Sequence, residues 1–223
     1  MKQVLLLALV AVSVAPLGVA GSCAAGTLAG YIALGATGCT IGGDTLYDFK
    51  VLAGSDGGAQ LATSSVTLTP SGSTFNPSLA LSVNLSIKTP ITDETMFTYD
   101  ISGPGFIAAS AVLSGSMESG DGGVSGIQNY CAGGSFGPDG VDGCPGVTDG
   151  LVTVDGAQNS AADTFSKVSF LSVTNDFTLG VSSDGTASGG TFTDSFTAVP
   201  EPAALGLLGF GLVFAAAFRR RSK

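Results

Sequence analysis

Few residues of this chain are of the types that do chemistry, because its 223 residues include no histidine and no tryptophan. One stretch, Gly133-Gly134-Ser135-Phe136-Gly137, matches the G-x-S-x-G pattern around the nucleophile of many hydrolases. That pattern requires a strand before it, a helix after it and a histidine base elsewhere in the chain. The sequence predicts none of the three, and a loop rich in glycine and serine produces such a match by chance. We therefore expect no catalysis at Ser135.

Carboxylates are the other candidate catalysts. Two acids about 5 to 10 Å apart can share the acid, base and nucleophile roles of glycoside hydrolysis. Asp93, Glu94, Asp100 and Glu118 are the candidates for such a pair. The absence of tryptophan, the usual platform on which a sugar ring stacks, argues against a carbohydrate-cleaving cleft. We expect that the protein is not an enzyme, and a carboxylate-pair hydrolase stays the catalytic alternative.

A second group of acids, Asp139, Asp142 and Asp149, lies among glycines in a short stretch of chain. Calcium binds six to eight oxygens, and glycine-rich loops expose backbone carbonyls that can supply some of them. The spacing matches no EF-hand, however, and Asp-Gly is a common turn dipeptide. Calcium binding therefore stays open, and we assign no metal or cofactor site.

The four cysteines, Cys23, Cys39, Cys131 and Cys144, allow three disulfide connectivities. Pairing within each half of the chain, Cys23 with Cys39 and Cys131 with Cys144, is favoured because each pair closes a short glycine-rich loop. Each bond would constrain the unfolded chain by about 3 kcal/mol. A zinc site is the alternative, but the chain has no CxxC spacing and no histidine.

Between the cysteines the pattern is that of strands and turns. Apolar and polar residues alternate from Leu79 to Lys88, which predicts a half-buried strand. Many short strands with turn signals between them indicate an all-β, antiparallel β-sandwich, with a jelly-roll-like arrangement as one form of it. We also expect a short helix within Ala24–Leu34 and a long stapled surface loop from Gly115 to Gly150. The further predicted strands are 46–53, 65–69, 95–102, 106–114, 151–154, 166–173, 177–181 and 191–198.

The first twenty residues predict a secretory signal peptide, residues 1–20. A basic start at Lys2 is followed by the apolar run Val4 to Ala15, and small residues at Gly18 and Ala20 favour cleavage after Ala20 by signal peptidase. Ala20-Gly21-Ser22 before Cys23 faintly resembles a lipoprotein cleavage box, but it lacks the usual leucine.

The segment that would remain, residues 21–199, has the length of one domain. It holds three lysines, Lys50, Lys88 and Lys167, against sixteen acids, so its net charge is −13. Such a surface repels nucleic acid, and we expect no nucleic-acid partner.

The last residues, 200–223, form three parts in order. Sixteen uncharged residues would span about 24 Å as a helix, a little less than the roughly 30 Å hydrocarbon core of a membrane. The basic cluster after them favours the cytoplasmic side, so the rest of the chain is predicted to lie outside. The parts are Pro200-Glu201-Pro202, the predicted transmembrane helix Ala203 to Phe218, and Arg219, Arg220 and Arg221 before Ser222-Lys223.

This tail resembles the PEP-CTERM sorting signal of exported bacterial proteins. The resemblance implies that an exosortase, a membrane-embedded cysteine protease and transpeptidase, recognises Pro200, Glu201 and Pro202. It implies that the helix is held transiently in the inner membrane and that Arg219 to Arg221 stop its transfer. Genes of this family usually accompany exopolysaccharide and biofilm production. The stretch from Cys23 to Gly42 also resembles the mature amino terminus of many members.

We therefore expect an exported protein of the cell surface or extracellular matrix with a structural or adhesive role. Its hydroxyl-rich composition suits contact with extracellular polysaccharide. A carbohydrate- or calcium-binding module is the first alternative, and the carboxylate-pair hydrolase is the second.

Overall fold

The computed structural model describes residues 20–54, 58–88 and 90–199, and most of these residues are in β-strands. The all-β class predicted from the sequence is confirmed. Within the described residues, no helix is long and apolar enough to cross a membrane. The predicted signal peptide before Ala20 and the predicted helix from Ala203 to Phe218 lie outside them.

Two short helical elements precede most of the strands: α1 (Leu28–Ile32) and the 3-10 helix η1 (Gly35–Thr37). The strands are β1 (Gly21–Ser22), β2 (Gly26–Thr27), β3 (Cys39–Ile41), β4 (Asp44–Val51), β5 (Ala59–Gln60), β6 (Val66–Ser73), β7 (Asn76–Val83), β8 (Ser86–Ile87), β9 (Ile91–Ser114), β10 (Met117–Ala132), β11 (Val147–Val154), β12 (Ser160–Ser188) and β13 (Thr191–Ala198).

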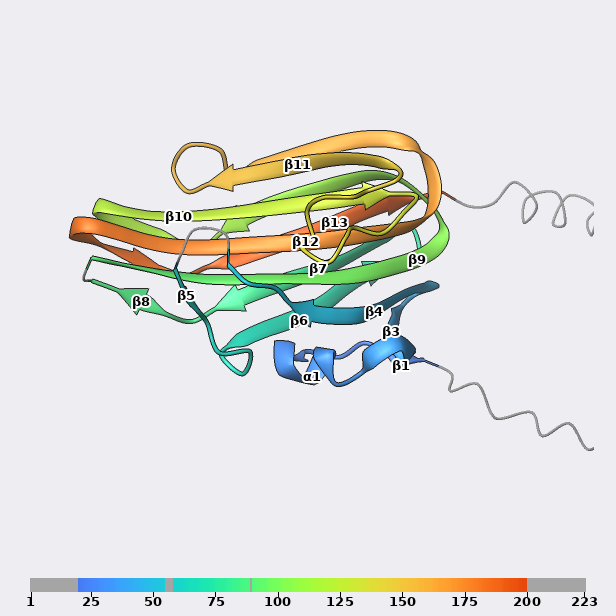
Figure 1. Ribbon diagram of the computed structural model, residues 1–223, viewed down its shortest axis with the longest axis horizontal. Coiled ribbons are helices and arrows are strands. Elements are labelled where there is room, and N and C mark those ends of the chain that lie inside the picture. Colours follow the sequence, from blue (N-terminus) through green and yellow to red (C-terminus); the bar gives the residue numbers. More distant parts are fainter. Residues whose placement is uncertain (1–19, 55–57, 89, 200–223) are drawn as a thin grey trace, which may run out of the picture.

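The described strands hydrogen-bond into one curled sheet that doubles back over its own core (Figure 1). Its main path runs β1-β3-β4-β9-β13-β7-β6-β2, and β12 adds β10 and then β11 to one layer. Most neighbours are antiparallel, but β1 with β3 and β5 with β9 are parallel. The prediction of two separate antiparallel sheets is therefore wrong, because the two layers belong to one continuous, mixed sheet.

The layers are continuous because β9 turns a corner and serves both. Its first half, 91–102, pairs with β4 and β12, and its second half, 106–114, pairs with β13 and the start of β12. The corner is Gly103-Pro104-Gly105. A Cβ on Gly103 would lie 1.9 Å from Asp44 Oδ1, and Gly105 has a φ of 150°. Glycine permits both the close approach and the unusual backbone.

The N-terminal segment joins the two ends of the sheet. β1 pairs with β3 at one end of the main path, and β2 pairs with β6 at the other. The Cys23–Cys39 disulfide lies at this junction and is the local pair favoured by the sequence. The expected short helix is present as α1, which is begun by the Thr27 side chain and buries Leu28 and Tyr31 against the core.

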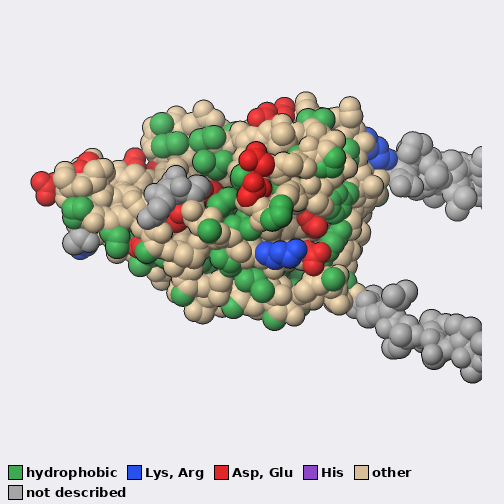
Figure 2. Space-filling view, in the orientation of Figure 1, with side chains coloured by type: hydrophobic (Ala, Val, Ile, Leu, Met, Phe, Trp, Pro, Cys, Tyr) green, Lys and Arg blue, Asp and Glu red, His purple; other side chains and the backbone are tan. Residues whose placement is uncertain are grey.

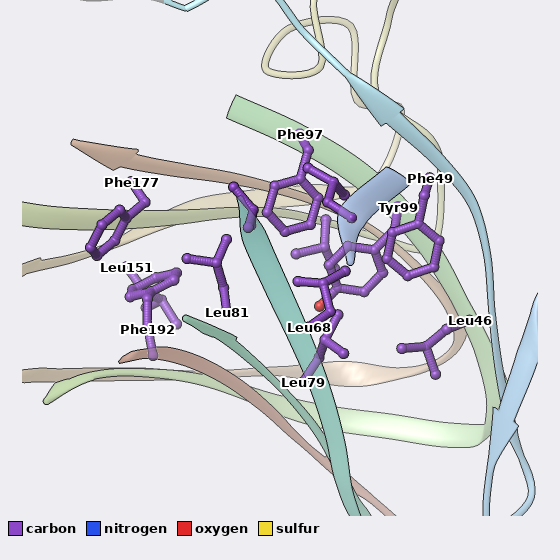
Figure 3. Close-up of a cluster of buried hydrophobic side chains, with 14 of the residues drawn as sticks. Leu46, Phe49, Leu68, Leu79, Leu81, Phe97, Tyr99, Leu151, Phe177 and Phe192 are labelled. Atoms are coloured by element: carbon purple, nitrogen blue, oxygen red, sulfur yellow. The ribbon is translucent and has the colours of Figure 1, made fainter. Parts of the chain in front are cut away.

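Aromatic rings fill the space between the layers near α1. Tyr31 meets Phe49 edge-on with ring centroids 5.0 Å apart, and Phe49 stacks on Tyr99 at 5.1 Å. Phe97 continues this row at 6.2 Å from Tyr99 (Figure 3). Phe177 of β12, Leu151 and Phe192 belong to the same buried cluster (Figure 3). Such pairs add about 0.5 to 1.5 kcal/mol each to the burial of the rings.

The sequence pattern locates some strands well and misses the long strand β10 as well as the short strands β1, β2, β3 and β5. β13 has the predicted bounds, and β7 shows the expected alternation as far as Val83. The loop predicted at 115–150 is wrong in its first half, where the structure has β10. Gly126 of β10 explains the glycine content there: a Cβ on it would lie 2.4 Å from Phe192 Cδ2 of the facing layer.

A polar cluster lies inside this core. Asp194 of β13 is fully buried and accepts hydrogen bonds at Oδ2 from the Tyr99 hydroxyl, at 2.8 Å, and from the Asn175 amide. Gln128, also fully buried, is the register partner of Asn175. Burial raises the pKa of Asp194 to about 7, although both hydrogen bonds act to lower it. Desolvation of the carboxylate is thus the dominant effect.

The contact between Gly126 and Phe192 predicts unequal effects of one substitution along β10. Gly126→Ala places a methyl group against the Phe192 ring and should lower the free energy of unfolding by about 1 to 3 kcal/mol. Gly123→Ala is the matched control, since the nearest atom to its Cβ is Glu118 Oε2 at 4.0 Å. Urea unfolding of both variants measures the difference, and equal midpoints would contradict the packing described.

The buried Asp194 predicts that stability falls as pH rises. The folded-state pKa lies above the ordinary value of 3.8, so between about pH 4 and pH 7 the folded chain binds more protons than the unfolded one. The free energy of unfolding should therefore decrease across this window, by roughly 4 kcal/mol at most from Asp194. Asp44, whose pKa burial raises to about 6, acts in the same direction.

Asp194→Asn should remove most of this pH dependence, whereas Asp184→Asn, at an exposed position, should keep it. Thermal unfolding followed at several pH values between 4 and 8 measures the slope. A slope unchanged in Asp194→Asn would show that the carboxyl is ionised throughout.

Candidate functional site

A cavity of about 430 Å³ opens on the outer face of the β4–β9–β12 layer, beside the loop closed by Cys131 and Cys144. We call it the groove. Its floor consists of side chains that alternate outward from the strands, and its wall comes from the loop. The groove is lined by Asp48, Lys50, Leu52, Thr98, Asp100, Ser135, Phe136, Gly137, Pro138 and Ser172.

A bulge in β4 brings Asp48 to the groove. Tyr47 pairs with Asp100 and Lys50 pairs with Thr98, so two residues of β4 lie opposite Tyr99 alone. Phe49 takes the inward position and stacks on Tyr99. Asp48 is the extra residue, and in the described part of the chain it is the one non-glycine residue with a positive φ, 55°. The bulge thereby lets one strand fill the core and supply an additional carboxylate outside.

Asp100 is the half-buried acid on the groove floor. Burial is the main cause that raises the pKa of its carboxyl, and the nearby Asp48 charge raises it further. The Ser172 hydroxyl and Lys50 act in the opposite direction but do not reverse the shift. Ser172 is the register partner of Asp100 on β12, which places both side chains on the outer face. The groove therefore holds two acids and one base whose charges influence one another.

The groove wall is rigidified by its own hydrogen bonds. The Cys131–Cys144 disulfide closes the loop, and the Gly137 amide donates to the Asp142 carbonyl at 2.7 Å. Thr174 of β12 donates its hydroxyl to the Gly140 carbonyl and so ties the loop to the sheet. Leu52 also packs against Gly140, because a Cβ on that glycine would lie 2.2 Å from Leu52 Cδ1.

A second hollow, of about 370 Å³, lies further along the same outer face. Thr92, Thr178 and Gly180 line it, together with Asp121 at its edge. Hydrogen bonds from Ser183 lower the pKa of Asp121, which is fully exposed. The β12 side chains that point outward from the first hollow to the second are Ser172, Thr174, Asp176 and Thr178.

This outer side of β12 therefore carries hydroxyl groups and a carboxylate, although Thr174 and Asp176, between the two hollows, are themselves buried. Figure 2 views the molecule from this side and shows basic and acidic side chains next to one another over β4. Most of the surrounding surface is neither charged nor hydrophobic (Figure 2).

The structure separates the acids proposed as a catalytic pair. Glu94 and Asp100 both point outward from β9, but six residues of strand place them roughly 20 Å apart. Asp93 points toward the other face of β9, and Glu118 lies exposed on β10. Asp48, which the sequence did not single out, is the acid that joins Asp100. The sequence carries no signal for it, since a bulge depends on the register between two strands.

The Ser135 motif differs in part from the expectation. A strand, β10, does end directly before it at Ala132, but turns rather than a helix follow it. Ser135 lines the groove. The residues considered for calcium do not converge: Asp139 Oδ1 accepts from the amides of Val141 and Asp142, while Asp149 belongs to β11. Among the described residues, no three cysteine or acidic side chains are grouped so that they could hold a metal ion.

Both disulfides join cysteines that are near in sequence. Cys23–Cys39 and Cys131–Cys144 are 16 and 13 residues apart, and no cysteine of the described chain is free. These bonds agree with a location outside the cytoplasm. Pro200, Glu201, Pro202 and Arg219 to Arg221 lie outside the described residues.

Comparison with known proteins gives one informative result. Residues 198–221 match the PEP-CTERM protein-sorting motif, which coincides with the tail identified from the sequence. No curated protein matches the chain. A solved structure, TmCBM61 in complex with beta-1,4-galactotriose, shares 9% identity with a TM-score of 0.27, covering 65% of this chain and 86% of that one. A likeness this distant carries no weight for fold or function. The chain thus carries a PEP-CTERM sorting motif, the mark of an exported protein that an exosortase processes.

Proposed function

We propose that the exported domain is a non-enzymatic component of the cell surface or extracellular matrix that adheres to extracellular polysaccharide through the groove. The sorting motif supports export and processing, and the groove is the observation that supports the adhesive role. In this proposal, signal peptidase releases residues 1–20, the inner membrane holds the chain transiently, and residues 21–199 are the working part.

The groove suits a sugar in its chemistry. Carboxylates at Asp48 and Asp100 accept hydrogen bonds from sugar hydroxyls, and Thr98 and Ser172 can either donate or accept. The Phe136 ring offers an apolar surface for the C–H face of a sugar ring, as aromatic side chains commonly do. Sites of this kind combine a concave shape with a few placed polar groups. The second hollow on the same face suits a chain of sugars rather than a single one.

A second function, carboxylate-pair hydrolysis, is favoured by one observation. Asp100 has a raised pKa and lies close enough to Asp48 for that acid to contribute to the shift. Two acids in unequal environments are the arrangement in which one serves as acid and the other as base or nucleophile. Of this pair, Asp100 is among the four acids predicted from the sequence and Asp48 is not.

Polysaccharide binding should be saturable and should depend on the groove. With exopolysaccharide from the producing cells as the probe, Asp100→Asn and Phe136→Ala should each weaken binding by about 10- to 100-fold. Asp142→Asn is the control, since Asp142 is exposed on the same loop but does not line the groove. Affinity electrophoresis gives the dissociation constants, and equal constants for all four proteins would place binding elsewhere.

The same preparations separate adhesion from hydrolysis. The adhesive role predicts no new reducing ends after prolonged incubation with the polysaccharide. Hydrolysis predicts turnover that both Asp48→Asn and Asp100→Asn abolish. Release of reducing ends by the native protein, lost in both variants, would replace the adhesive proposal with the catalytic one.

Processing at both ends predicts the mass of the mature protein. Chains recovered from cells and medium should begin at Gly21, end near Pro200 and contain two disulfides. Intact-mass spectrometry before and after reduction measures all three features. Recovery solely of chains that end at Lys223 would argue against exosortase processing and for a plain membrane anchor.

A further inference from the structure

The last strand of the domain ends at Ala198, where the matched sorting motif begins and two residues before its Pro200-Glu201-Pro202 triplet. β13 pairs with β9 up to Ala198. Two further backbone hydrogen bonds hold Ala198 and Val199 in place. The Ala198 amide donates to the Phe75 carbonyl at 2.8 Å, and the Val199 amide donates to the Gly105 carbonyl at 2.8 Å. The residue before Pro200 is therefore fixed to the corner of β9.

No spacer separates this fixed residue from the Pro-Glu-Pro triplet. Successive Cα atoms are about 3.8 Å apart, so Pro200 begins one peptide unit from the surface of the domain. A protease cleft holds its substrate extended over several residues. The corner is also covered: a Cβ on Gly105 would lie 1.9 Å from Lys167 Cε, which shows that the lysine side chain packs over it. A folded domain at this distance obstructs the approach of an enzyme to Pro200.

We infer that the fold of this domain restrains its own sorting motif, and that an exosortase reaches the motif only when the end of β13 is detached. This inference rests on the processing implied by the motif. Detachment occurs either before the domain closes after export or by local opening of the folded domain. The attachment of residues Thr197 to Val199 therefore decides whether processing can follow folding of the domain or must precede it.

The structure also limits how far the strand can open. Pairing of β13 with β7 ends at Ser195, and the register with β9 shifts between Thr197 and Ala198. Residues 197–199 therefore have fewer partners than the rest of the strand. Phe196 stops the opening, because its side chain is 1% exposed and its ring meets Phe106 edge-on at 6.1 Å. Ala198 is the one core residue among these three, at 4% exposed, so separation of residues 197–199 removes a single small side chain from the core.

A flexible spacer tests this restraint in the full chain expressed in its own cells. Insertion of about six alternating glycine and serine residues between Val199 and Pro200 adds up to about 20 Å of reach. Pulse labelling and mass analysis should then show processing about tenfold faster than in the native chain, because the obstructing step is removed. The same residues inserted between Gly156 and Ala157, in the turn after β11, are the control and should leave the rate unchanged.

Two results would overturn the inference. Equal processing rates for the native and spacer chains would show that the domain does not control access. Exchange of the Ala198 and Val199 amides at the rate of an unstructured peptide, measured by hydrogen exchange in the purified full chain, would show that they are not held. Protection of these amides, together with faster processing of the spacer chain, would support the inference. If neither chain is processed, the sorting proposal fails and the inference fails with it.

Discussion

The curled sheet depends on a junction of three residues. Cys23-Ala24-Ala25 connects β1, paired at one end of the sheet path, to β2, paired at the other. β1 and β2 do not pair with each other, so this short connection holds the two ends of the sheet path together through the covalent chain rather than through a strand ladder. The Cys23–Cys39 bond fixes the junction by closing a loop of 16 residues, a constraint of about 3 kcal/mol on the unfolded chain. The aromatic row from Tyr31 to Phe97 is enclosed behind it.

The groove follows from the same packing. Phe49 stacks on Tyr99 inside the curled sheet, and the bulge that places it there gives β4 an extra residue, Asp48. The opposite wall depends on the Thr174 bond to Gly140, made by a β12 residue that points out of the core. Interior and exterior are thus coupled: a change that moves Phe49 would also move a carboxylate of the groove.

Much of the fold could be predicted from the sequence where side chains alternate. β13 and most of β7 were located because buried and exposed residues succeed one another. β10 was missed because its glycines have no side chain to alternate, although Gly126 is needed for the approach of Phe192. The corner at Gly103-Pro104-Gly105 predicts the end of a strand, whereas β9 continues through it in a new direction. Asp100 was a candidate from the start, but Asp48 depends on strand register, which no single segment encodes.

The position of β13 has a mechanical consequence. Whatever holds the chain after Val199 will pull on β13 along its own axis, and this strand lies between β7 and β9, antiparallel to both. A tensile load applied in that direction shears the ladders on both sides at once instead of breaking their hydrogen bonds one at a time. Once residues 197–199 have yielded, the remaining ladder resists as a unit. β13 is thus placed to bear a load that is applied at the C-terminal end of the domain.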